Sequence, residues 1–160
     1  MSARTTFDAV VPVRDELYKE LLERVCPFAH YAGLVIRSEQ VRLTTGGAAV
    51  LDQLEPFLVR REDVKSWPGT LLIGTRVSRR DLFALTPESI DVLKSAASEL
   101  SAWVNPDLPE DLHLLREDGT TVLGSVAQHE DAWLELDDWE SRDFDATASD
   151  ALHKAFVARP

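Results

Sequence analysis

The sequence predicts an α+β fold, with a mainly antiparallel sheet of about five to six strands and three to four helices packed on it. Two observations support this prediction. Short segments of alternating hydrophobicity and segments of helical periodicity follow one another irregularly, and the best-marked strand pair is a hairpin that turns at Asp118-Gly119. A further strand after this hairpin completes a C-terminal β-meander. With 160 residues, 44% of them hydrophobic, the chain suits a single domain over residues 1–160, with 138–160 as a loosely packed tail.

The first half of the chain predicts one amphipathic helix among several short elements. Residues 15–25 carry a single apolar stripe, and Pro27 ends the helix. Residues 5–13 alternate as a strand does, and Pro12 suggests a position at the sheet edge. Further along we expect strands at 33–36 and 41–45, a brief helix around 50–54, a polar loop at 60–68, a strand at 70–77, and a strand or helical turn at 81–85.

The second half contains the clearest helix, which runs from Thr86 to Trp103. Thr86 suits the N-cap position and Pro87 the first helical position, while Asn105-Pro106 ends the segment. Asp-Gly favours a two-residue type I′ turn between strands at 112–117 and 120–126, which places Glu117 opposite Thr120, Leu115 opposite Val122 and His113 opposite Gly124. Both faces of this hairpin are apolar, so we expect it in the middle of the sheet. A third strand follows at 132–136, then a polar tail with a weak helix around 152–156.

The charge distribution excludes some classes of function. The net charge of −11 disfavours binding to nucleic acid, which needs a basic surface. Residues 1–85 hold 11 acidic and 12 basic residues, whereas residues 86–160 hold 17 acidic and 5 basic ones. The second half therefore carries a net −12 and would attract a basic partner, although the same acidity also serves solubility. The basic residues include only four lysines, a bias typical of GC-rich bacterial genomes.

Targeting and cofactor signals are lacking in this sequence. We find no apolar run long enough to span a membrane and no signal peptide, so we expect a cytoplasmic protein without membrane association. A single cysteine, Cys26, excludes a disulfide framework and a four-cysteine zinc site. No cofactor and no metal are predicted.

The candidate partner-binding surface lies between residues 130 and 140. In the predicted strand, Ala132, Leu134 and Leu136 point to one side and Trp133 points to the other, together with acidic residues. Carboxylates without basic partners cannot lie in a deep core, so Trp133 should sit on an acidic, partly wet surface, as aromatic anchors of interfaces do. The alternative is that a helix of the tail covers Trp133. The predicted binding residues are Glu130, Asp131, Trp133, Glu135, Asp137, Asp138, Trp139 and Glu140.

Other chemistry-bearing residues give weaker signals. His129 and Glu130 could form a general-base pair, but no second histidine lies at a metal-ligand spacing, and a solvated turn explains them equally well. Cys26 is interpreted as a small buried hydrophobe. The Gly46-Gly47 turn lacks the further glycines of a dinucleotide loop and the lysine of a P-loop. No catalytic residue is predicted.

The C-terminal half resembles small acidic bacterial α+β proteins of the toxin-immunity kind. The resemblance lies in the Leu-Pro-Glu-Asp-Leu string at 108–112, in Asp118-Gly119, and in the Ser-Val-Ala-Gln-His-Glu-Asp-Ala-Trp-Leu string at 125–134. It implies a protein that neutralises a toxin by covering its active surface. Where the toxin is a nuclease, a carboxylate-rich face would occupy the place of the substrate. The resemblance transfers no catalytic residue.

These observations lead to one main functional hypothesis and two alternatives. We expect a non-enzymatic, immunity-like protein-binding module that docks an acidic surface on a basic protein such as a toxin. The first alternative is a small-molecule-binding domain or small enzyme with a pocket between sheet and helices, which perturbed acids or histidines would mark. The second is an assembly subunit, which a large apolar patch would mark. The sequence identifies neither the partner nor the oligomeric state.

Overall fold

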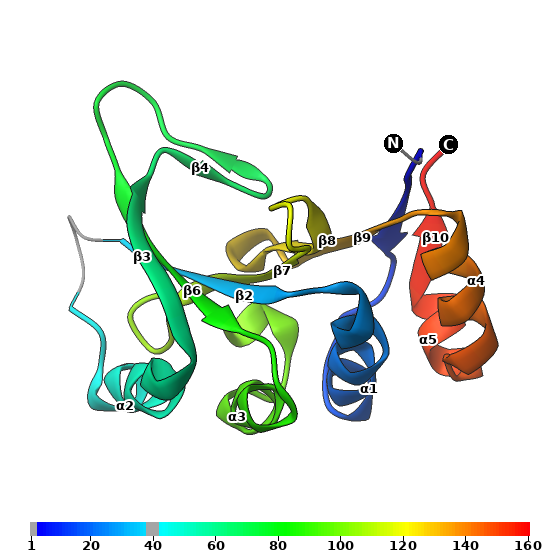
Figure 1. Cartoon of the computed structure of the whole chain (residues 1–160), viewed down its shortest axis with the longest axis horizontal. Helices are drawn as coiled ribbons and strands as arrows, with labels where there is room; N and C mark the ends of the chain where they lie inside the picture. The colour runs from blue at the N-terminus through cyan, green and yellow to red at the C-terminus, as the bar shows by residue number, and fades with distance from the viewer. Residues whose placement is uncertain (1–2, 38–41) are drawn as a thin grey trace.

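The computed structural model describes residues 3–37 and 42–160, which form an α+β fold around one large antiparallel sheet. The eight strands of this sheet lie in the order β10-β1-β9-β8-β7-β2-β6-β3. The helices cover one face of the sheet, and a separate two-stranded hairpin, β4–β5, lies over the opposite face (Figure 1). The strands of the large sheet are β1 (Thr5–Ala9), β2 (Tyr31–Ile36), β3 (Leu58–Val64), β6 (Ser78–Ala84), β7 (Glu110–Leu115), β8 (Thr121–Val126), β9 (Asp131–Leu136) and β10 (Phe156–Ala158). The hairpin strands are β4 (Ser66–Trp67) and β5 (Thr70–Leu71), and the helices are α1 (Glu16–Val25), α2 (Thr45–Leu54), α3 (Pro87–Ala96), α4 (Asp138–Thr147) and α5 (Asp150–Ala155).

The main core lies between the sheet and the helices. The predicted stripe of α1 faces it, and Tyr18, Leu21, Leu22 and Val25 are buried there. The Tyr18 hydroxyl donates a hydrogen bond to the carbonyl of Leu93 on α3, at 2.6 Å, so the two helices are tied together inside the core. No helix in the described part of the chain is long and apolar enough to cross a membrane.

The predicted start of α3 is confirmed in detail. Thr86 accepts a hydrogen bond from the backbone N–H of Ser89, the Ser89 hydroxyl accepts one in return, and Pro87 occupies the first turn. The helix ends at Ala96, earlier than predicted. The segment beyond it includes the short 3₁₀ helix η3 (Leu100–Ala102), which leads to the buried Trp103. Apolar spacing continued past the end of the helix because these residues still face the core.

The C-terminal β-meander β7–β8–β9 is confirmed, but its first turn differs from the prediction. Leu114 pairs with Leu123 in the predicted register, whereas Leu115 pairs with Thr121 across a β-bulge. Only Gly119 in the turn has a positive φ, of 86°, whereas a type I′ turn needs two such residues. The Asp118 carboxylate accepts hydrogen bonds from the backbone N–H and the hydroxyl of Thr120, at 2.9 and 2.6 Å, and so stabilises the three-residue loop.

The number of strands and helices exceeds the prediction. Residues 60–68, predicted as a polar loop, belong largely to β3 and the β4–β5 hairpin. The charges of β3 concealed the strand because they pair across to β6: the Arg61 guanidinium contacts the Asp81 carboxylate at 3.1 Å, and Arg80 contacts Glu62 at 2.8 Å. Residues 81–85 are mostly strand, as part of β6.

Three further predictions of strands need correction. The strand predicted at 70–77 is formed only at Thr70–Leu71, because Gly74 turns the chain at a φ of 74°. Of 41–45, residue 41 lies outside the described residues, residues 42–44 form no strand, and Thr45 begins α2. The strand predicted at 5–13 ends at Ala9, and it is not an edge strand because β10 pairs on its outer side.

Residues 138–160 form α4, α5 and β10. Their apolar residues pack against the main core, and β10 pairs with β1 through three residues of each strand. The buried side chains of this segment are Phe144, Leu152, Ala155 and Phe156. The first and last strands of the chain, β1 and β10, therefore lie side by side at one edge of the sheet (Figure 1).

Candidate functional site

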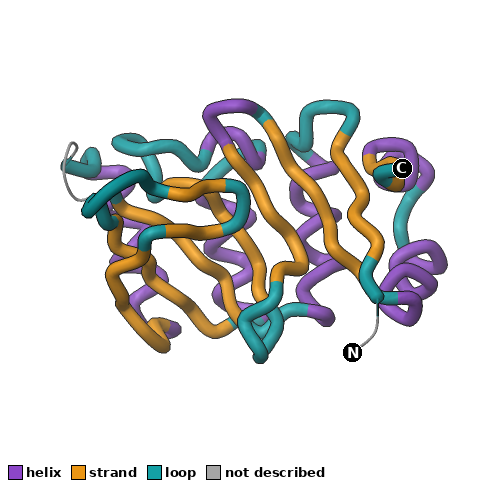
Figure 2. The backbone as a smooth tube through the Cα atoms, turned by 90° about the horizontal axis from the view of Figure 1, so that it is seen from above, coloured by secondary structure: helices purple, strands orange, loops and turns teal. Residues whose placement is uncertain are grey.

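The face of the large sheet that points away from the helices, called here the open face, carries the residues of interest. A single row of paired residues crosses it, and the hairpin β4–β5 lies over part of it, leaving strands towards the termini uncovered (Figure 2). Strand pairing places Asp8 between Val157 and Trp133, and it places Gly33 between His113 and Leu82. Two glycines lie beside ring side chains in this row: Gly124 beside Trp133 and Gly33 beside His113.

Trp133 rests on the backbone of Gly124, its neighbour on β8. A Cβ atom on Gly124 would lie 2.3 Å from Cζ2 of the indole, so only glycine leaves room for the ring. Above the ring, a Cβ on Gly69 at the tip of the β4–β5 hairpin would lie 2.7 Å from Cη2. The indole Nε1–H donates to the Glu135 carboxylate at 3.0 Å. Trp133 is therefore half-buried and fixed in orientation, and it is the hairpin tip, and not a tail helix, that covers it.

His113 on β7 lies against Gly33 of the neighbouring strand β2, as Trp133 on β9 lies against Gly124 of β8. It is buried, and its ring lies so close to Gly33 that a Cβ there would be 2.1 Å from Nε2. Nδ1 lies 2.8 Å from the carbonyl of Asp111 and can donate to it, while Nε2 has no partner among the described residues. Burial without a counter-charge lowers the pKa of His113 to about 4, so the imidazole is neutral at neutral pH.

The hairpin β4–β5 is anchored to the sheet by one aromatic side chain. Trp67 is buried beneath the hairpin, and its Nε1–H donates to the Asp111 carboxylate at 2.8 Å. The guanidinium of Arg37 lies 5.0 Å from the centre of the Trp67 ring and also pairs with the buried Glu110 at 2.7 Å. Burial raises the pKa of Asp111, while hydrogen bonds from Trp67 and from the backbone N–H of Ala127 oppose this effect.

An open cleft, called here the Trp133 cleft, lies between the hairpin tip and the strands near the termini. It encloses about 420 Å³, and its lining includes Asp8, Gly69, His129, Asp131, Trp133 and Arg159. The Arg159 guanidinium pairs with the Asp8 carboxylate at 2.6 Å and lowers the pKa of that acid. Asp131 is exposed, and its carboxylate makes no hydrogen bond or ion pair with any residue that the structure describes. One wall of the cleft is thus an indole beside an unpaired carboxylate.

The eight residues predicted as one binding surface separate into three groups. The alternation of β9 is confirmed: Ala132, Leu134 and Leu136 are buried towards the helices, and Trp133 lies on the open face. The open-face group contains Asp131, Trp133 and Glu135, with the exposed Glu130 immediately before it.

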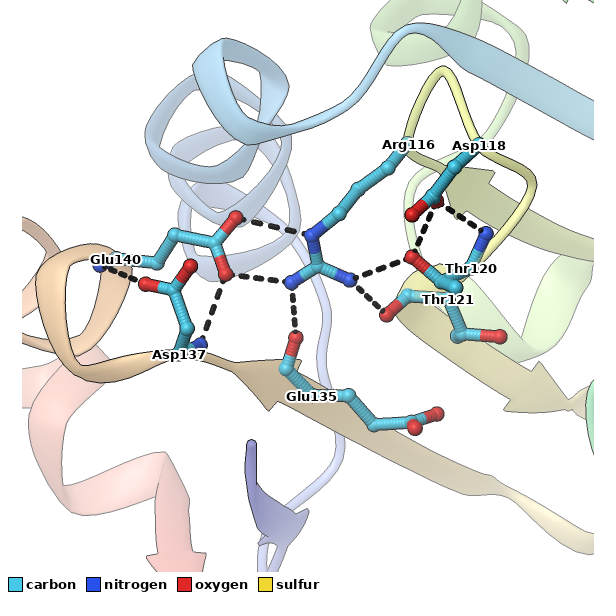
Figure 3. A network of polar contacts seen from close by, with 7 residues as sticks. All are labelled: Arg116, Asp118, Thr120, Thr121, Glu135, Asp137 and Glu140. Atoms are coloured by element: carbon cyan, nitrogen blue, oxygen red, sulfur yellow. Dashed lines mark hydrogen bonds and ion pairs between the residues drawn. The ribbon is translucent and has the colours of Figure 1, made fainter. Parts of the chain in front are cut away.

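A second group serves the structure of the protein. Asp137 caps α4 by accepting a hydrogen bond from the backbone N–H of Glu140 at 2.8 Å, and the Glu140 carboxylate accepts one from the backbone N–H of Asp137 (Figure 3). The buried Glu140 also contacts the Arg116 guanidinium through both of its carboxylate oxygens (Figure 3). Arg116 donates further to the carbonyls of Thr121 and Glu135. These carboxylates are already occupied, so Asp137 and Glu140 do not belong to a free acidic surface.

The third group lies at the start of α4, away from the cleft. Trp139 is 62% exposed, and its ring meets that of Phe28 edge-to-face, with a distance of 5.9 Å between the ring centres. Phe28 belongs to the 3₁₀ helix η1 (Cys26–Phe28), which follows α1 on the helix side of the sheet. The expectation of one continuous surface is therefore wrong for Trp139, whose ring packs on the helix side. Asp138 precedes it as an exposed residue in the first turn of α4.

A small-molecule-binding domain or small enzyme of the kind considered above would need a pocket between the sheet and the helices. In this structure, packed side chains fill that space. Leu34, Leu112 and Leu114 of the sheet are buried against Leu21, Leu22 and Leu93 of the helices. Within residues 3–37 and 42–160, no group of three or more histidine, cysteine or acidic side chains could hold a metal ion. His129 lines the Trp133 cleft, and Glu130 beside it has the left-handed φ of 56° that ends the 3₁₀ helix η4 (Ala127–His129).

Sequence reasoning missed Asp8, Gly69 and Arg159 as neighbours of Trp133. They come from opposite ends of the chain and from the turn at Pro68-Gly69, which lies between the loop predicted at 60–68 and the strand predicted at 70–77. The one available signal was the predicted register, in which Gly124 falls opposite His113 in the meander. A glycine in a central strand often marks a close approach of another group, here the indole of the next strand.

Comparison with known proteins identifies no relative: no protein-family model, curated protein or solved structure matches this chain.

Proposed function

We propose that this chain is a non-enzymatic binding protein that docks a basic protein partner at the Trp133 cleft. The observation that supports this best is the wall of the cleft itself. There a half-exposed indole is held rigidly between Gly124 and Gly69 beside the unpaired Asp131 carboxylate. A rigid aromatic side chain at the border of a polar rim is typical of interface anchors.

The chemistry of the cleft favours a cationic side chain. A guanidinium or ammonium group that reached the part of the indole left free by Gly124 and Gly69 would gain a cation–π interaction, which is strongest with tryptophan. The same cation could pair with Asp131, which loses no existing partner. Asp8 contributes less because Arg159 already neutralises it. The proposed anchor point is therefore Trp133 with Asp131, and Glu130 and Glu135 add negative charge nearby.

The charge of the C-terminal half would assist the encounter. Its net −12 attracts a basic partner over several ångströms and accelerates association at low ionic strength. Neutralisation of a toxin with a basic active surface is a specific form of this proposal. It rests on the resemblance in residues 108–134, and a partner identified as a toxin would establish it.

The proposal is tested by the affinity of the purified protein for a short, labelled oligo-arginine peptide. Asp131→Lys places a positive charge in the cleft without breaking any contact, and we expect it to weaken binding by about tenfold, which corresponds to about 1.4 kcal/mol. Asp52→Lys makes the same change of net charge at an exposed position of α2 on the helix side. We expect this control to have less than a twofold effect, about 0.4 kcal/mol.

Equal losses of affinity in the two variants would contradict the proposal, because binding would then depend on net charge alone. Asp137 and Glu140 are unsuitable for this test, since lysine there would break the cap of α4 and the contact with Arg116.

A further inference from the structure

The outer edge of the β4–β5 hairpin exposes two large apolar side chains. Leu71 and Ile73 are 77% and 85% exposed, the highest values among the large hydrophobic residues of the described chain. They lie where the sequence alternates as a strand does, in a segment predicted to be a strand over 70–77. A strand pattern without a covering partner indicates a surface that another chain could complete.

The hydrogen bonds of the hairpin determine which backbone groups face outward. Trp67 pairs with Thr70 across Pro68-Gly69, and the φ of 82° at Gly69 fits the third position of a type II turn. The backbone N–H of Leu72 donates to the carbonyl of Lys65 at 2.8 Å, so the backbone N–H and C=O of Leu72 face inward, towards the strand that contains β4. Because backbone groups alternate along a strand, the N–H and C=O of Leu71 and Ile73 face the free edge.

This edge is complementary to itself. When two antiparallel copies pair around a twofold axis through Leu72, Leu71 of each copy lies opposite Ile73 of the other. Leu71 and Ile73 both present outward N–H and C=O groups, so the two pairs can form four hydrogen bonds. Their side chains lie on the same face of the pair and would contact each other across the interface. The φ of 74° at Gly74 ends this pairing after Ile73.

The local charge favours a second copy of the chain over a basic protein. Residues 64–80 hold four basic residues and no aspartate or glutamate, and two of the four, Arg79 and Arg80, pair with Asp81 and Glu62. A basic protein would therefore find no acidic side chain of this segment to pair with, whereas a second copy carries a net charge of −11. Elsewhere, two copies with a net charge of −11 each would repel one another more strongly. We therefore infer that the free edge of β5, at Leu71 and Ile73, pairs with the same edge of a second copy and forms a symmetric dimer.

Sedimentation equilibrium over a range of concentrations tests this inference, up to about 1 mM because so small a contact gives a weak dimer. We expect a concentration-dependent dimer for the unmodified protein and a monomer for Ile73→Asp. Val59→Asp removes an exposed apolar side chain from β3, at another edge, and should leave the dimer unchanged. A protein that stays monomeric over the whole range, or a dimer that persists in Ile73→Asp, would overturn the inference.

The register is tested separately by disulfide formation in a Cys26→Ser background. Leu72 of each copy lies opposite Leu72 of the other as a pair without mutual hydrogen bonds, where Cα atoms approach to about 4.5 Å and a disulfide can close. Leu72→Cys should therefore give a covalent dimer under mild oxidation, and Thr75→Cys should not. Failure of Leu72→Cys to crosslink, or equal crosslinking of both variants, would contradict the proposed pairing. Neither experiment depends on whether the Trp133 cleft binds a partner.

Discussion

The orientation of Trp133 depends on a residue that lacks a side chain. Gly124 is buried in the central strand β8, where glycine is otherwise unfavourable because it leaves more conformational freedom to the unfolded chain. Its value lies in the space it leaves, since a Cβ would lie within 2.4 Å of two atoms of the indole ring.

Gly124→Ala should therefore displace Trp133 and lower the free energy of unfolding by about 1–3 kcal/mol, the usual cost of overpacking. Urea denaturation measures this loss, and the oligo-arginine peptide should bind the variant more weakly. Gly46→Ala is the control, because a Cβ on Gly46 in α2 meets only the Thr44 hydroxyl at 3.9 Å. Alanine should stabilise that helix by up to about 1 kcal/mol. A neutral Gly124→Ala would show that the ring has room to move.

His113 predicts a dependence of stability on pH. Its pKa is about 4 in the folded protein and near 6.5 when unfolded, so between these values the unfolded chain binds more protons. The free energy of unfolding should therefore decrease as the pH falls from 6.5 to 4, by about 3 kcal/mol over the whole window. His113→Leu lacks this titration and should show a shallower dependence in urea denaturation at pH 7 and pH 4.5.

The unmodified protein must be compared with His113→Leu because other charged groups near His113 also affect how stability depends on pH. Asp111 has a raised pKa, and its titration changes stability in the opposite sense, while Arg80 adds to the lowering at His113. Both neighbours are retained in His113→Leu, so the difference between the two pH profiles isolates the imidazole. Parallel profiles would contradict a neutral, buried His113.

At the scale of elements, the hairpin β4–β5 depends on Trp67 for its position over the open face. Trp67→Phe keeps an aromatic ring but removes the hydrogen bond to the buried Asp111. We expect a loss of about 1–3 kcal/mol in the free energy of unfolding, the cost of leaving a buried acceptor with one donor fewer. Amide hydrogen exchange should increase in residues 65–72. Protection unchanged from that of the unmodified protein would show that the hairpin is held by other contacts.

Which elements the sequence could predict follows from where their side chains point. α1 and the start of α3 were predictable because one face enters the core and local capping residues mark the boundaries. β3 was not predictable, because its charged residues pair with residues of β6 that are distant in the sequence. Arg61, for example, pairs with Asp81, 20 residues further along the chain. The segment 70–77 misled for the opposite reason: it has the pattern of a buried strand and lies on the surface.

The candidate site was predictable in part, for the same kind of reason. The alternation in 131–136 correctly placed Trp133 on the face away from the core. It could not show that β9 ends at Leu136 or that Trp139 of α4 then packs on the helix side. Nor could it show that Arg116, which follows β7, pairs with Glu140. These relations are long-range, so they depend on the arrangement of the whole sheet.

At the scale of the whole molecule, the acidic second half and the open face together define the proposed role. The strands near the termini leave the Trp133 cleft accessible, and the helices cover only the opposite face (Figures 1 and 2). If the partner is basic, its affinity should decrease as salt is raised from about 50 to 500 mM, because screening weakens exposed charge pairs. The salt dependence of the peptide affinity measures this, and Asp131→Lys should show a smaller one.

The most direct measurement of the central claim is a titration of the ¹⁵N-labelled protein with the oligo-arginine peptide, observed through the indole N–H resonances of the four tryptophans. Trp67 and Trp103 are buried, and Trp139 is exposed on the helix side, so each tryptophan reports on a different place. We predict that the Trp133 resonance shifts first and most, together with the backbone resonances of Asp131 and Gly69. A titration that shifts Trp139 and leaves Trp133 unchanged would contradict docking at the Trp133 cleft.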